Sequence, residues 1–201
     1  MAVKPLDFAL DLLDRAEELA KLAGNPPQGT SDVKMDVLRS AWVFIGASID
    51  TYFHERIRRT MLQDMSKSAR KFEVPLGDVD DMVALFLANR KEARPRVKLG
   101  NIIHQALLKQ TFQGATNVER AFGLIGQTKY WKEISVQLGE PVEDIKSRLN
   151  TQYQRRNRIS HEGDYTRQSR PQQFWYYLLD RTAVDEEIAW TRRFLKAADS
   201  L

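Results

Sequence analysis

Residues 31–60 read SDVKMDVLRSAWVFIGASIDTYFHERIRRT and carry the most regular helical pattern in the chain. Apolar side chains recur every three or four positions along this stretch, at Leu38, Trp42, Ile45, Ile49, Phe53 and Ile57. This spacing places them on one face of an α-helix. Ser31 and Asp32 are suitable cap residues, and the pattern continues to about Ser66. We therefore expect one long helix that forms the spine of a helical bundle.

The remainder of the chain shows helical periodicity in shorter pieces. Further helices are expected over residues 5–23, from a cap at Asp78 towards Pro95, around 102–107, from a cap at Asn117 to 125, over 130–138, from Pro141 into 155–161, and from Pro171 onward. No segment alternates apolar and polar residues for long enough to predict a strand. The prediction is an all-α fold, a single-domain helical bundle over residues 1–201 with a long second helix and a motif helix near the C-terminal third.

The composition is that of a soluble globular domain, with 42% hydrophobic residues in a chain of 201. There is no cysteine, which excludes disulfides and thiolate chemistry. The first 22 residues alternate acids and bases and contain no apolar run of signal-peptide or membrane-span length. We expect a cytoplasmic protein with no membrane partner. The net charge of +4 and the pI near 9.3 permit a polyanionic partner.

The sequence lacks the motifs of common nucleotide and metal enzymes. It contains no GxxxxGK[ST], GxGxxG or HExxH motif, and its histidines are only His54, His104 and His161. A histidine-rich metal site therefore lacks its usual ligands. We expect no metal and no cofactor.

Residues 155–164 read RRNRISHEGD and lie at the end of the predicted motif helix. Histidine can exchange a proton near neutral pH, and arginine can hold a phosphate through its planar fork. On a continuous helix Arg156 and His161 stand about 140° apart, whereas Asn157 and His161 share a face. Arg156 and His161 therefore address one phosphate only if the helix loosens near Gly163, or if a second copy of the chain supplies part of the site.

A groove shared by two such helices suits RNA cleavage without a metal. One histidine would accept the proton of a ribose 2′-hydroxyl, a second would protonate the leaving oxygen, and arginine would stabilise the phosphorane. The alternative is a helix end at which His161 and the arginines favour the negative end of the helix dipole. Spacing alone does not favour RNA cleavage over this plainer interpretation.

Two further features have alternative interpretations. Asp50 follows Ile49 beside the apolar stripe, and we favour a solvated carboxylate over one that binds or orients an arginine of residues 155–164. The aromatic run at 174–177 could stack on nucleobases, but most aromatic residues are core residues, and we favour the core.

At Arg156, Asn157 and His161 the sequence resembles the HEPN superfamily, whose mark is an arginine, a polar residue and a later histidine on one helix of an α-helical bundle. The run RRNRISHEGD is similar to Arg-Arg-Asn-x-Ile-Ala-His-Glu-x-Asp of the RiboL-PSP-HEPN branch. Residues 48–52, 112–119 and Trp131 are also similar to that branch, so the resemblance covers most of the chain from about residue 38. Ser160 replaces the commoner alanine, and Asp50 replaces a frequent glutamate.

The resemblance implies a metal-independent endoribonuclease, acting as a toxin or phage-defence effector. By the same resemblance Arg156 and His161 are catalytic residues, with Asn157 beside them. Around them we place the supporting residues Asp50, Arg155, Arg158 and Glu162. The implied partners are RNA, a second copy of the chain that completes a composite site, and an antitoxin or regulatory protein. The alternatives are a non-catalytic HEPN-like module that binds RNA, nucleotide or a protein partner, and a bundle whose arginines are only surface residues.

Overall fold

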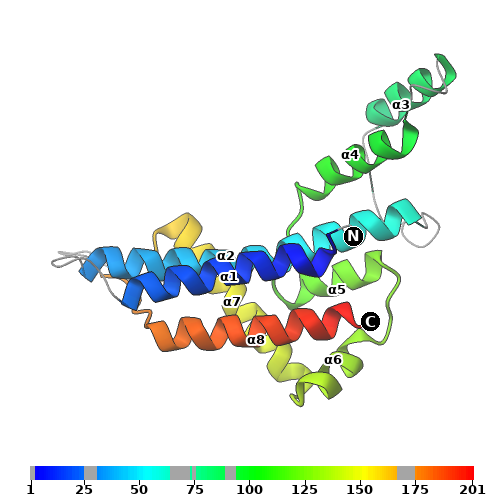
Figure 1. Ribbon diagram of the computed structural model, residues 1–201. Helices are drawn as coiled ribbons and strands as arrows, with labels where there is room; N and C mark the ends of the chain where they lie inside the picture. The colour runs from blue at the N-terminus through cyan, green and yellow to red at the C-terminus, as the bar shows by residue number, and fades with distance from the viewer. Residues whose placement is uncertain (1–2, 25–30, 64–72, 74–75, 89–93, 167–174) are drawn as a thin grey trace. The chain divides into compact units, whose positions relative to one another are not determined.

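The computed structural model describes residues 3–24, 31–63, 73, 76–88, 94–166 and 175–201 (Figure 1). The helices in these ranges are α1 Pro5–Gly24, α2 Ser31–Gln63, α3 Leu76–Ala88, α4 Pro95–Leu107, α5 Ala115–Leu124, α6 Tyr130–Leu138, α7 Val142–Glu162 and α8 Arg181–Asp199. The only β pairing within the described ranges is an isolated antiparallel bridge between Tyr165 and Tyr176. The predicted all-α fold is confirmed.

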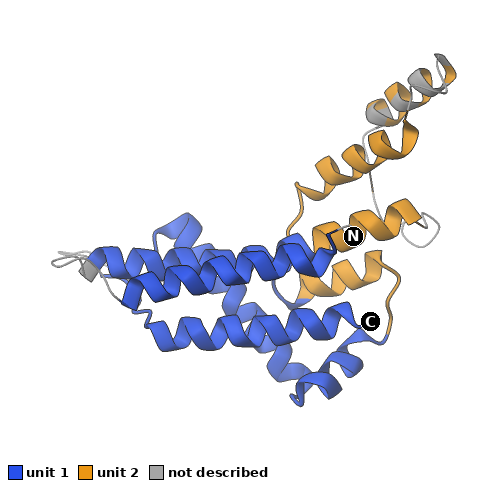
Figure 2. Ribbon diagram, in the orientation of Figure 1, with its two compact units in different colours: residues 1–52, 113–115, 129–201 blue, residues 53–112, 116–128 orange. Residues whose placement is uncertain are grey.

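The chain divides into two compact units (Figure 2). Unit 1 comprises residues 1–52, 113–115 and 129–201, and unit 2 comprises residues 53–112 and 116–128. Helix α2 begins in unit 1 and ends in unit 2. The motif helix α7 and all residues predicted for the site lie in unit 1.

Helix α1 packs along α8 in unit 1. Its buried residues recur three and four positions apart and are mostly small: Ala9, Leu13, Ala16, Ala20 and Ala23. Small side chains let two helix backbones approach closely, and the larger residues of α8, such as Trp190 and Phe194, fill the core. At the rim, Arg192 of α8 pairs with Asp14 of α1 at 2.9 Å and with Glu17 at 3.3 Å.

Helix α7 is held in unit 1 by two buried polar contacts as well as by its apolar face. Ile145, Leu149 and Gln152 are buried. The Gln152 side chain donates from Nε2 to Oγ1 of Thr191 in α8 at 2.9 Å. Its backbone carbonyl accepts a hydrogen bond from the indole Nε1 of Trp42 in α2 at 3.3 Å. Since buried polar groups need such partners, these bonds fix α7 one turn before residues 155–164 begin.

The long second helix and α6 were predicted well, but the start of α5 was not. Helix α6 has the predicted bounds, and α2 extends at least to Gln63, with 64–66 outside the described residues. Helix α5 begins at Ala115 instead of after Asn117. The reason is a distant cap, because Oδ1 of Asn150 in α7 accepts the Ala115 N–H at 2.9 Å.

The predicted final helix is wrong at its start. Helix α8 begins at Arg181, where Oδ1 of Asp180 accepts the Ala183 N–H at 2.8 Å. Upstream, the Thr166 N–H donates to Trp175 O at 2.7 Å and the Tyr177 N–H donates to Asp164 O at 3.0 Å. These bonds hold residues 175–177 in an extended conformation instead of a helix. Residues 171–174, where the helix was predicted to begin, lie outside the described residues.

Unit 2 contains the end of α2 together with α3, α4 and all of α5 except Ala115. Helices α3 and α4 pack against each other. Asp78 lies inside α3, which begins at Leu76, so the predicted cap at this residue is wrong. The edge of the Phe53 ring meets Phe122 at a centroid distance of 5.2 Å.

None of the helices in the described ranges combines the length and hydropathy needed to cross a bilayer.

Candidate functional site

Helix α7 runs without interruption through the motif and ends at Glu162. Gly163 follows in the left-handed conformation, with φ of 63°. The helix therefore does not loosen before His161, which was one of the two ways for Arg156 and His161 to meet. Asn157 and His161 lie four residues apart on one face, and His161 is exposed.

Arg156 lies on a different face of α7, against the glycine of α2. A Cβ atom at Gly46 would lie 3.2 Å from Cγ of Arg156 and 2.7 Å from Oε1 of Gln113. The missing side chain at Gly46 thus provides the space that the arginine stem and the glutamine occupy. The half-buried Arg156 then donates from Nη1 to Oδ1 of Asn157 at 3.1 Å. This bond connects the guanidinium to the residue that shares a face with His161.

Asp50 is half-buried and bonded to a neighbour, so the favoured interpretation of a solvated carboxylate is wrong. Its Oδ2 accepts a hydrogen bond from Nε2 of Gln113 at 3.1 Å. The other end of this amide is the one that faces Gly46 beside Arg156. Asp50 therefore orients Gln113, which shares the space over Gly46 with Arg156.

Arg155 points away from Arg156 and binds a buried carboxylate. Its Nη2 pairs with Oδ2 of Asp164 at 2.7 Å and also donates to the carbonyls of Tyr177 at 3.1 Å and Leu178 at 3.3 Å. Burial lowers the pKa of the Arg155 guanidinium, and the negative charge of Asp164 opposes this shift. Arginine remains protonated in proteins, so the effect is on stability instead of charge. Arg155 supports the site by holding the chain after α7 in place.

Asp164 is fully buried and binds a second arginine, Arg39 of α2. Nε of Arg39 lies 3.1 Å from the same Oδ2 atom, and Nη1 of Arg39 pairs with Asp36 at 2.9 Å. Asp164 has φ of 59°, a conformation that aspartate and asparagine adopt more readily than most residues. One carboxylate thus joins α2, α7 and the extended segment that precedes α8.

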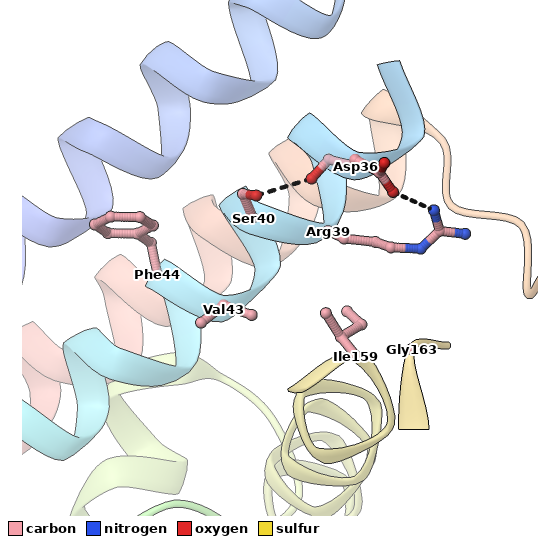
Figure 3. Close-up of a pocket in the computed structure, with 7 residues that line it drawn as sticks. All are labelled: Asp36, Arg39, Ser40, Val43, Phe44, Ile159 and Gly163. Carbon is pink, nitrogen blue, oxygen red and sulfur yellow. Dashed lines mark hydrogen bonds and ion pairs between the residues drawn. The ribbon is translucent and has the colours of Figure 1, made fainter. Parts of the chain in front are cut away.

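A pocket of about 390 Å³ lies between α2 and the end of α7, beside this ion pair (Figure 3). Arg39 extends from α2 over Ile159, and Asp36 is bonded to its guanidinium in the same view. Val43 and Phe44 of α2 and Gly163 also line the pocket. The pocket lies on the α2 side of α7, away from the face that carries Asn157 and His161.

Arg158 and Glu162 lie on a neighbouring face of α7, at a second pocket of about 390 Å³. The Arg158 guanidinium lies over the Tyr177 ring, 4.5 Å from its centroid. The pocket is lined by Gln154, Asn157, Arg158, Glu162, Tyr165 and Tyr177. We call it the aromatic pocket.

The sequence placed all predicted site residues except Asp50 on the motif helix, and the structure has them on α7, but several of their neighbours were not predicted. Gln113 and Tyr177 contact predicted site residues, and Arg39 binds Asp164 beside them; none of the three was predicted as part of the site. Asp164 stood inside the quoted stretch, after a glycine and at the last position of the resembling run, but no structural role was predicted for it. Their contacts join residues up to 125 positions apart, which spacing along one helix cannot reveal.

Within the described residues, no three histidine, aspartate or glutamate side chains form a group that could hold a metal ion. Comparison of the chain with models of protein families, with curated proteins and with solved structures gave no match.

The ion pairs of the buried Asp164 with Arg39 and Arg155 predict that substitution of Asp164 lowers the stability of the fold. Asp164→Asn keeps the shape and tolerates the positive φ, but it leaves the half-buried Arg155 guanidinium without a counter-charge and the buried Arg39 with only the exposed carboxylate of Asp36. We expect the free energy of unfolding in urea, followed by circular dichroism, to fall by about 3–5 kcal/mol.

Asp185→Asn is the matched control, because Asp185 pairs with Arg181 on the surface of α8 at 3.3 Å. Exposed pairs of this kind contribute about 1 kcal/mol or less. Equal losses in the two variants would contradict the role assigned to Asp164.

Proposed function

We propose that this chain is a metal-independent endoribonuclease of HEPN type. The observation that carries the proposal is the connected set on the last turns of α7, in which Arg156 donates to Asn157 and Asn157 shares a face with the exposed His161. A guanidinium, a carboxamide and an imidazole placed together can bind a phosphodiester and move its protons. The resemblance to the HEPN superfamily assigns the same three residues.

In the proposed reaction, a ribose 2′-hydroxyl of the RNA attacks the adjacent phosphate of the same strand. Neutral His161 accepts the proton of a ribose 2′-hydroxyl, and the 2′-oxygen bonds to the adjacent phosphorus. Arg156 stabilises the negative charge that develops on the phosphorane oxygens. The bond to the 5′-oxygen then breaks, and that oxygen takes a proton from a protonated histidine. The products are a 2′,3′-cyclic phosphate and a free 5′-hydroxyl.

The proton transfers require two histidines, because one imidazole cannot be base and acid in the same step. On the unbroken α7, Arg156 and His161 also stand about 140° apart. A second copy of the chain, with its α7 facing the first, supplies the second histidine and completes the composite site. The protein then acts in the cytoplasm on RNA as a toxin or phage-defence effector, with an antitoxin or regulatory protein as a further partner.

Substitution of His161 tests the chemistry. Wild-type protein should cleave single-stranded RNA in EDTA, leave DNA of the same sequence intact and produce ends with a 2′,3′-cyclic phosphate, as measured by mass spectrometry. His161→Ala should cleave about 10²- to 10⁴-fold more slowly, the usual contribution of a positioned acid or base.

Ser160→Ala is the control for this measurement, because Ser160 is the exposed neighbour of His161 and carries no role in the reaction. It should cleave like wild type. Intact RNA after incubation with wild type, or equal cleavage by His161→Ala, would contradict the proposal. RNA binding that survives in His161→Ala and is lost in Arg156→Ala, without cleavage by wild type, would instead identify a non-catalytic binding module.

Dilution tests the shared site. The rate of cleavage per protomer should fall in proportion to the dimer fraction, because a single chain lacks the second histidine. Mass photometry measures the dimer fraction at each concentration, and a constant amount of serum albumin controls for loss on surfaces. A rate per protomer that stays constant while monomer predominates would place the whole site within one chain.

A further inference from the structure

We propose that the aromatic pocket binds one nucleobase of single-stranded RNA, next to the phosphate that the motif addresses. The inference rests on the proposed function, and it adds to that function the part of the substrate that is recognised. The pocket shares Asn157 with the motif, and its α7 residues Gln154 and Arg158 stand seven and three positions before His161, near the same face of the helix. A base in the pocket therefore contacts Asn157 and lies next to the helix face that carries His161.

The walls of the pocket are aromatic side chains at the surface. Tyr165 is 40% exposed. For the aromatic run at 174–177 we had favoured a buried position in the core. Trp175 and Tyr176 of that run are also exposed, at 56% and 43%, so the core interpretation is wrong for both. Phe174 lies outside the described residues. Exposed rings beside arginines are typical of surfaces that stack unpaired bases.

These rings are held in place before any ligand binds. Tyr165 stacks on Tyr176 with a centroid distance of 4.8 Å and an interplanar angle of 30°. The Tyr177 ring lies under the Arg158 guanidinium. The backbone of Tyr177 bonds to Asp164, whose carboxylate is fixed by Arg39 and Arg155. A preorganised wall loses little conformational entropy on binding, which favours affinity.

The polar groups of the pocket select a nucleobase over other occupants. Gln154 and Asn157 carry amides that both donate and accept hydrogen bonds, and Glu162 carries a carboxylate. A base has an apolar face for the rings and a polar edge for these groups. Glu162 offsets the positive charge of Arg158, so the pocket attracts a phosphate less than an arginine alone would, and an apolar side chain would leave the amides without partners. The volume of about 390 Å³ lies within the range of about 300–1,000 Å³ for small-molecule pockets.

The experiment separates base binding from backbone binding and from cleavage. The probe is a fluorescent 2′-O-methyl oligouridine, which has no 2′-hydroxyl proton and cannot be cleaved, compared with an abasic oligonucleotide of the same length and charge. Fluorescence anisotropy with the full chain should show about tenfold tighter binding of the oligouridine, within the range measured for stacking of one base.

Tyr165→Leu should remove most of this difference and leave the affinity for the abasic probe unchanged. Tyr165→Phe keeps the ring and should bind like wild type. Tyr130→Leu is the matched control, because Tyr130 begins α6 and does not line the pocket. It should also bind like wild type. Thermal unfolding of each variant confirms that it is folded.

Equal binding of the two probes by wild type, or equal losses in Tyr165→Leu and Tyr130→Leu, would overturn the inference. Neither result would affect cleavage of RNA in EDTA, so the proposed ribonuclease would stand. Conversely, a preference for the oligouridine that depends on Tyr165, in a protein that leaves RNA intact, would keep the base pocket and refute the ribonuclease.

Discussion

The buried carboxylate of Asp164 is the constraint on which the site depends. Taking a carboxylate and two guanidiniums out of water costs several kcal/mol for each charge, and only close pairing offsets that cost. Oδ2 of Asp164 lies within 3.1 Å of Arg39 and 2.7 Å of Arg155, so both arginines must be in place together. The pairing joins the start of α2 to the end of α7, and the bond from Tyr177 to Asp164 O adds the extended segment.

Three arginines that stand close together in the sequence have different surroundings in the structure. Arg155 turns inward to Asp164, Arg156 lies along Gly46 and bonds to Asn157, and Arg158 covers the Tyr177 ring. Successive residues on a helix point about 100° apart, so neighbours in sequence face different surroundings. The three arginines therefore have three different roles. Arg155 forms a structural ion pair, Arg156 is a motif residue whose aliphatic part packs at Gly46, and Arg158 lines the aromatic pocket.

Elements defined by local interactions were predicted from the sequence, whereas helix ends set by long-range contacts were missed. Helix α6 and the stripe on α2 were predicted because local periodicity and turn residues define them. The start of α5 was missed because Asn150, 35 residues away, caps it. The start of α8 was missed because residues 175–178 pair with residues 164–166 and with Arg155. Long-range hydrogen bonds overrode a local preference in both places.

The all-α class, the long second helix and the position of Arg156, Asn157 and His161 on one motif helix followed from the sequence pattern alone. These features depend on periods of three to four residues, which can be read along the chain. Tertiary contacts alone establish that Arg155 is bound to Asp164, that Asp50 holds Gln113 beside Arg156, and that Trp175 and Tyr176 are exposed. The reason is that each of these outcomes depends on contacts between distant segments, where burial sets the balance between desolvation and pairing.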